Sequence, residues 1–180
     1  YVRSNAPRAQ VHLMDDMAFS LDVDTLLRST PEHGPLGRLA SVLWAKMFEQ
    51  RNVPALDDVF RAFGLRQLLA GLEQRAGESE LYCFRTDGEK TDIALPPSNI
   101  DLSEVFKFGV ETKEVAFLSA ASVFKYLSCF KTVHTNRLHM AISSALLGLD
   151  VRFHANDYYK CRAVYEQSMR ERFPNVSWVG

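Results

Sequence analysis

The sequence lacks the features that take a protein into or across a membrane. No stretch of its 180 residues approaches the roughly 20 apolar residues that a membrane-spanning helix requires. No charged segment followed by a short apolar core opens the chain, so no secretory signal is predicted. The first residue is Tyr1 and not methionine, which indicates a fragment, a processed product or an N-terminus that extends further.

Charge of one sign is also missing, and cysteine is scarce. The 21 Lys and Arg residues nearly balance the 22 Asp and Glu residues, and a net charge of −1 provides no field that would attract nucleic acid. Cys83, Cys129 and Cys161 have no metal-ligand spacing and lie in apolar or helical runs. We therefore expect buried free thiols, a cytoplasmic location, no nucleic-acid partner and no metal site.

Glycine-rich phosphate loops are absent too. The sequence contains neither a Gly-x-Gly-x-x-Gly segment nor a P-loop, so the motifs for dinucleotide and Walker-type phosphate binding are missing. There is no internal repeat and no low-complexity segment. With 47% hydrophobic and 24% charged residues, the composition is that of an ordinary globular protein, and the length suits one domain over residues 1–180.

What the sequence does contain is an alternation of short β-type runs with amphipathic helical patterns. The expected strands are 11–14, 80–84, 132–134 and 151–154, and the expected helices are 36–50, 57–72, 114–129, 138–147 and 156–173. Strands alternating with helices predict an α/β fold, namely a Rossmann-like, mostly parallel sheet with helices on both faces.

The most informative stretch is Thr135-Asn136-Arg137-Leu138-His139. From Leu138 the apolar residues have the spacing of one helix face, with Thr135 as the expected N-cap and Gly148 as the expected stop. Arg137 and His139 then lie at the start of a helix, where unpaired N–H groups already favour an anion. Cationic side chains at this end oppose the usual dipole preference, so the stretch predicts a phosphate or carboxylate site.

Polar clusters follow four of the expected strands. In a parallel sheet, the carboxyl ends of the strands meet at one edge, where ligands bind. Each cluster also has a structural alternative: Arg85 can pair with Asp87 or Glu89, Asp15 or Asp16 can cap a helix or act as a general base, and Lys160 can be a surface residue. His134 and His139 are five residues apart, which is not zinc spacing. The clusters begin at Asp15, Arg85, His134 and His154.

Several segments resemble the polysaccharide pyruvyl transferase family. The resemblance is tightest over residues 115–168, and the earlier segments are weaker. It is carried by Thr135-Asn136-Arg137-Leu138-His139, Leu146-Leu147-Gly148, Asn156-Asp157-Tyr158-Tyr159-Lys160, the Leu81–Glu89 strand and turn, and Leu13–Phe19. Family members are usually longer and have an N-terminal Rossmann-like half. The resemblance therefore implies the C-terminal lobe of a two-lobed, glycosyltransferase-B-like enzyme.

The resemblance implies a transferase of exopolysaccharide or cell-wall glycan biosynthesis. Such an enzyme moves an enolpyruvyl group from phosphoenolpyruvate to a sugar hydroxyl pair and forms a pyruvate ketal. The donor is a substrate, and no cofactor is expected. The acceptor is a glycan or a lipid-linked sugar, through which peripheral membrane association would arise.

The donor's phosphate and carboxylate suit a clamp of two arginines, Arg85 and Arg137. Asn136 and Lys160 are further donor-binding candidates. His139 fits the general acid, and Asp15 or Asp16 the base.

Two other functions remain open from sequence. The first is a nucleotide-sugar-dependent glycosyltransferase of the same two-lobed type, whose diphosphate would occupy the same edge. The second is a non-catalytic domain that binds an anion or a glycan.

Overall fold

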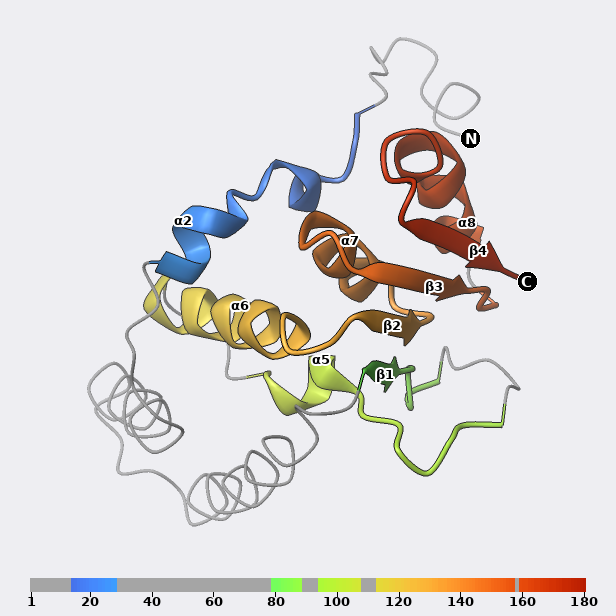
Figure 1. The fold of residues 1–180 in the computed structure, drawn as a ribbon, viewed down its shortest axis with the longest axis horizontal. Coiled ribbons are helices and arrows are strands. Elements are labelled where there is room, and N and C mark those ends of the chain that lie inside the picture. Colours follow the sequence, from blue (N-terminus) through green and yellow to red (C-terminus); the bar gives the residue numbers. More distant parts are fainter. Residues whose placement is uncertain (1–13, 29–78, 89–93, 108–112, 158) are drawn as a thin grey trace, which may run out of the picture.

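The computed structural model describes residues 14–28, 79–88, 94–107, 113–157 and 159–180. Within them lies a sheet whose four strands run parallel in sequential order, β1-β2-β3-β4, so their carboxyl ends share one edge (Figure 1). The α/β class with a parallel sheet is thereby confirmed. The strands are β1 (Glu80–Cys83), β2 (Thr132–Thr135), β3 (Asp150–His154) and β4 (Val176–Val179).

Helices connect each strand to the next. The described part of the β1–β2 connection holds α5 (Leu102–Val105) and α6 (Lys113–Leu127), and α7 (Leu138–Leu146) joins β2 to β3. Between β3 and β4 lie α8 (Tyr159–Val164) and the π-helical turn η2 (Tyr165–Met169). Ahead of β1 are η1 (Met17–Ser20) and α2 (Val23–Arg28). None of the described helices has both the length and the apolar character needed to cross a membrane.

The described helices pack on one face of the sheet. Leu81, Val133, Val151 and Val176 form one row across the four strands, and all are buried among helix residues. Sequential parallel strands joined by right-handed crossovers place every connecting helix on the same side. Among the described elements helices therefore cover one face, and the expected helices 36–50 and 57–72 lie outside the described residues.

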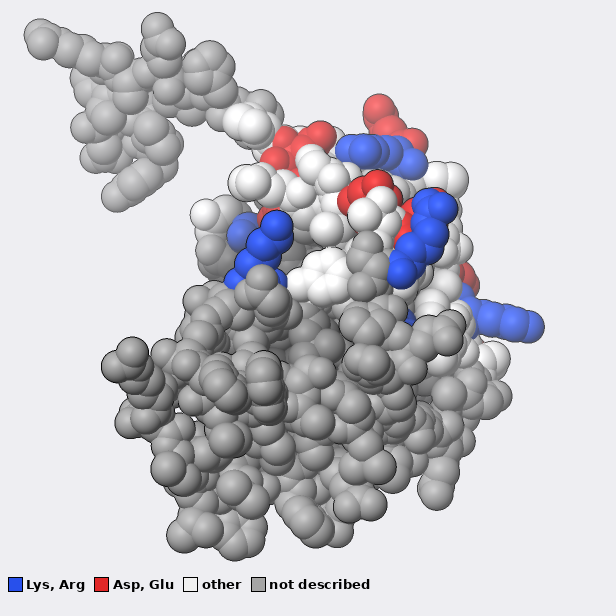
Figure 2. Space-filling model, turned by 90° about the vertical axis from the view of Figure 1, so that its left-hand side faces the viewer, with Lys and Arg blue, Asp and Glu red and all other residues white. Residues whose placement is uncertain are grey.

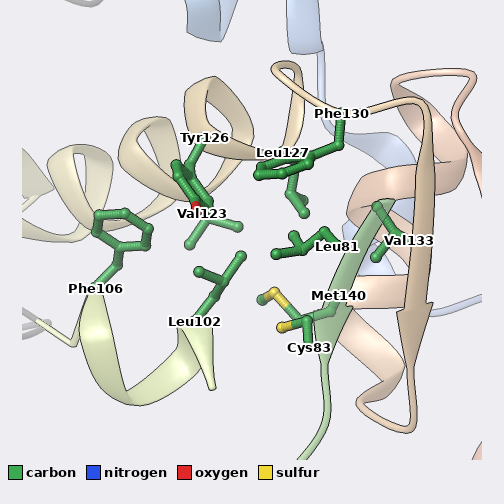
Figure 3. Packing of buried hydrophobic residues seen from close by; sticks show 10 residues of the cluster. All are labelled: Leu81, Cys83, Leu102, Phe106, Val123, Tyr126, Leu127, Phe130, Val133 and Met140. Carbon is green, nitrogen blue, oxygen red and sulfur yellow. The ribbon is translucent and has the colours of Figure 1, made fainter. Parts of the chain in front are cut away.

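Two apolar clusters fill the space between this face and the helices. In the first, side chains of α5 and α6 meet Leu81, Cys83 and Val133 from β1 and β2 (Figure 3). In the second, α7, α8 and η2 pack on Val151, Phe153 and Val176. The sheet and helices therefore form a continuous scaffold below the carboxyl edge.

The opposite face of the sheet, here called the polar face, is built from alternate strand residues. Its side chains are partly or fully exposed, consistent with the alternation of a half-buried strand. Its central members are Glu80, Tyr82, His134, Asp150, Arg152, His154 and Ser177.

The carboxyl end of β1 is closed by a loop on its outer side. The side-chain amide of Asn99 accepts from the Phe84 N–H at 2.8 Å and donates to the Phe84 carbonyl at 3.2 Å. One residue later, the Ile100 N–H donates to the Tyr82 carbonyl at 3.0 Å. Asn99 thus satisfies both backbone groups of Phe84, as a neighbouring strand would.

Some local expectations need correction. Helix α7 begins at Leu138, so Arg137 and not Thr135 is its N-cap residue. Thr135 ends β2, where its hydroxyl donates to the Cys83 carbonyl and accepts from the Arg137 N–H. Cys83 and Cys161 are buried as expected, whereas Cys129 is exposed.

Other expectations fall partly or wholly outside the described residues. Met14 is not in a strand, and the rest of the expected strand 11–14 lies outside the described part, as do helices 36–50 and 57–72. Strand β4 was not expected from the sequence.

Candidate functional site

The candidate site lies where β1 and β2 end. Cys83 and Thr135 are register partners at the two strand ends, so the residues that follow them lie side by side. Arg85 leaves the end of β1, and Arg137 stands between β2 and α7. The sheet therefore brings together the two arginines that are 52 residues apart in the sequence, as the parallel arrangement predicts.

A shared carboxylate joins the two arginines. Arg85 donates from Nε to one oxygen of Asp87 at 2.8 Å and from its terminal nitrogen to the other at 2.9 Å. Arg137 donates to the same second oxygen at 3.1 Å. This bidentate arrangement is the usual geometry of guanidinium–carboxylate recognition. The Arg85–Asp87 pair that the sequence left open is thus present, and it involves Arg137 as well.

Asp101 is a site residue that the sequence analysis missed. Its side chain is only 5% exposed, and one carboxylate oxygen contacts Arg137 and accepts from the backbone and hydroxyl of Thr86. Its other oxygen, Oδ1, is buried with no hydrogen-bond partner, as is Nε of Arg137. The sequence did not single out Asp101 as a site residue, because an aspartate directly before Leu102 has the pattern of a helix N-cap. In the structure the Asp101 side chain makes no capping hydrogen bond.

Asn136 connects the two strand ends. It is fully buried, and its side-chain oxygen accepts from the Arg85 backbone N–H at 2.8 Å. Its own carbonyl accepts from the Asn156 side chain at 3.2 Å. Asn136 therefore fixes the backbone of Arg85 through this hydrogen bond. Because it is fully buried, it supports the site and does not form part of its surface.

His139 and Asp16 form a second group. Nε2 of His139 lies 3.6 Å from an oxygen of Asp16, whose other oxygen caps η1 through the Ala18 N–H. Asp15 faces elsewhere, because it accepts from the Ser168 hydroxyl at 2.7 Å and lies 3.8 Å from Arg172. His139 is two residues from Arg137, a separation at which side chains of a helix do not face each other.

The structure places Lys160 in α8 and His154 at the end of β3, where its ring packs against Phe84. Lys160 is exposed in the first turn of α8, next to the buried Cys161. Burial raises the pKa of the Cys161 thiol, and the nearby charges of Arg85 and Lys160 oppose that rise. His154 ends β3 on the polar face.

Charges around the site are compensated. Arg85 and Arg137 face Asp87 and Asp101, so the four side chains have no formal net charge. On the side of the molecule seen in Figure 2, the described acidic and basic side chains are likewise close together, without a large patch of one sign. An anionic ligand of the arginines would therefore have to replace a carboxylate. Asp87, with a side chain 39% exposed, is the one that can move into solvent.

The histidines of the polar face predict a pH effect on stability. Burial lowers the pKa of both His134 and His154. The carboxylates of Glu80 and Asp150 oppose the shift of His134 and Arg152 adds to it, while His134 adds to the shift of His154. Below an unfolded pKa of about 6.5, the unfolded chain binds more protons than the folded chain, so the free energy of unfolding decreases as the pH falls through this window. Below the folded pKa values the decrease levels off.

Denaturant unfolding between about pH 7 and pH 5 tests this expectation. A chain with His134→Gln and His154→Gln should show a flatter pH dependence, whereas His139→Gln at an exposed position serves as the matched control. An unchanged slope in the double variant would contradict the assignment.

Comparisons with known proteins add little at this point. The sequence matches no protein-family model, and no curated protein matches it. A crystal structure of a functionally uncharacterized protein from Klebsiella pneumoniae subsp. pneumoniae NTUH-K2044 is similar, with 34% sequence identity and a TM-score of 0.49. The match covers 56% of this chain and 36% of that chain. A similarity of this size to a protein without a known function carries no argument about the site.

Proposed function

We propose that the chain is the donor-binding part of a polysaccharide pyruvyl transferase that uses phosphoenolpyruvate. The observation that carries the proposal is the pair of arginines that share one carboxylate at the carboxyl edge of the sheet. Phosphoenolpyruvate offers a carboxylate of the same kind together with a phosphate. Two guanidinium groups side by side can bind both anions through charge-assisted bonds.

The chemistry requires two sugar hydroxyls and one proton at carbon. One hydroxyl oxygen bonds to the central carbon of phosphoenolpyruvate, while the methylene carbon takes up a proton and becomes a methyl group. The second hydroxyl oxygen then bonds to the same carbon, the carbon–oxygen bond to phosphate breaks, and inorganic phosphate leaves with the second hydroxyl proton.

In this proposal His139 supplies the proton, and a carboxylate accepts the proton of the first hydroxyl. Because His139 contacts Asp16 and not the arginines, the proposal requires the methylene end of the donor to extend from the arginines toward His139. Of the two candidates, Asp16 lies beside His139, whereas Asp15 is bonded to Ser168. We therefore assign the base to Asp16. Lys160, exposed in the first turn of α8, is assigned as a further positive charge for the donor.

The test is a calorimetric titration of the whole chain with phosphoenolpyruvate, with a panel of nucleotide sugars in parallel. Arg85→Met should weaken phosphoenolpyruvate binding by at least about tenfold, because it removes charge-assisted bonds worth about 1.5–3 kcal/mol. Arg152→Met, at an exposed ion pair with Asp150, is the matched control and should bind as the wild type does. Binding of a nucleotide sugar alone would replace the proposal with the glycosyltransferase alternative, and binding unaffected by Arg85→Met would reject the clamp.

Asp87→Asn should have the opposite effect on the same titration. The substitution keeps the size of the side chain but removes the charge that competes with the ligand for both arginines. We expect phosphoenolpyruvate to bind about ten times more tightly or better, on the same scale of charge-assisted bond energies. Asp150→Asn provides the control for a general change in charge. Weaker binding by Asp87→Asn would mean that Asp87 orients the arginines and does not compete.

A further inference from the structure

A pair of imidazoles on the polar face is not used by the proposed function. His134 lies on β2 and His154 at the end of β3, with Nδ1 of the first 3.4 Å from Nε2 of the second. Hydrogen bonds of ring nitrogens are usually shorter, about 2.7–3.2 Å. Two nitrogens that bind one tetrahedral zinc ion at about 2.0–2.1 Å are about 3.3–3.4 Å apart. The observed separation lies at the long end of hydrogen-bond distances, and it also equals the spacing of two nitrogens on one zinc ion.

The ring nitrogen of His134 that faces away from this pair has a carboxylate partner. Its Nε2 lies 3.8 Å from an oxygen of Glu80, and the Tyr82 hydroxyl donates to that same oxygen at 3.0 Å. Histidines that bind metals typically donate their second nitrogen to a carboxylate, which fixes the tautomer and makes the free nitrogen more basic. Glu80 lies near that supporting position, although at 3.8 Å it is too far to accept a hydrogen bond from His134 without a small movement.

Aromatic contacts hold both rings in place. The Tyr82 ring stacks on His134 with centroids 4.5 Å apart, and Phe84 packs edge-on against His154 at 4.9 Å. These contacts fix the orientation of both rings, so the pair is preorganised.

The nearby fixed charges do not oppose a cation. Arg152 is the register partner of His134 on the same face, but it is paired with Asp150 at 3.0 Å and donates to Ser177. With Glu80, the three charged side chains have a net charge of −1. His134 is 21% exposed and Glu80 51%, so solvent ions can reach the pair.

From this geometry we propose that His134 and His154 bind a late first-row divalent metal ion such as Zn²⁺, with Glu80 as the supporting carboxylate. Imidazole nitrogen suits zinc, copper and nickel. Among the described residues, no group of three His, Cys, Asp or Glu side chains is placed to hold a metal ion. The site thus has two protein ligands, and water or a bound molecule takes the remaining positions.

The test is a calorimetric titration of the whole chain with Zn²⁺. We expect one ion per chain, with binding lost in both His134→Ala and His154→Ala. The conservative variants His134→Gln and His154→Gln should lose it as well, and their circular dichroism shows whether each variant is folded. Glu80→Gln should weaken binding by about tenfold or more, as loss of a supporting carboxylate usually does.

Two variants control for other zinc ligands. His139→Ala removes an exposed imidazole and Cys129→Ser an exposed thiol, and both should bind zinc as the wild type does. Wild-type chain that takes up no zinc, or folded His134 and His154 variants that still bind it, would overturn the proposal. The outcome does not depend on phosphoenolpyruvate, since the arginine site uses none of these residues.

Discussion

Arg137→Met is expected to lower the free energy of unfolding by about 3–5 kcal/mol, because removing one partner of a buried ion pair leaves the other charge uncompensated. The stranded charge is Asp101, whose side chain is 5% exposed and retains only Thr86 among the partners described for its bonded oxygen. Urea denaturation followed by circular dichroism measures the loss.

Two further variants separate this effect from a general loss of packing. Adding Asp101→Leu to Arg137→Met should recover most of the stability, since an apolar pair of similar volume often replaces a buried ion pair without loss. Arg152→Met breaks the exposed pair with Asp150 and should cost less than about 1 kcal/mol. If Arg137→Met cost no more than Arg152→Met, the Arg137–Asp101 pair would have to be well hydrated.

Asn136→Ala is expected to cost about 2–4 kcal/mol, since it leaves the Arg85 N–H without its acceptor and opens a cavity at a fully buried position. Phosphoenolpyruvate binding should weaken at the same time, because the backbone of Arg85 is no longer held. Chemical denaturation and the phosphoenolpyruvate titration measure the two effects.

Asn175→Ala is the matched control for Asn136→Ala. Asn175 is only partly buried and donates one side-chain bond to the Leu149 carbonyl at 2.7 Å. Its loss should cost about 1 kcal/mol and leave ligand binding unchanged. Equal effects in the two variants would contradict the role of Asn136 as the connection between the strand ends.

Periodicity predicted the described core elements well. The apolar spacing from Leu138 gave α7, and the short apolar runs gave β1, β2 and β3 close to their observed bounds. Strand β4 was missed because its four residues, Val176–Val179, alternate too briefly to stand out after a helix. The N-cap position of Arg137 was missed because threonine is the more common capping residue. The Thr135 hydroxyl instead donates to the Cys83 carbonyl, which links β2 to β1.

The site was predictable only where it follows from parallel strands. Arg85 and Arg137 meet because they follow neighbouring strand ends, which the βαβ pattern implies. Asp101 joins them from the loop that returns along β1, a long-range contact that no local pattern encodes. The contact between His134 and His154 likewise depends on the register of β2 and β3, which sequence spacing does not give.

The side chain of Asn99 has a consequence for how this protein meets other chains. An edge strand with unpaired N–H and C=O groups is a template on which a foreign strand can add, the usual start of edge-to-edge aggregation. At the end of β1, Asn99 already occupies both groups of Phe84, and Ile100 occupies the carbonyl of Tyr82. A guest strand therefore finds the carboxyl end of β1 already paired, whereas β4 forms the other edge of the described sheet.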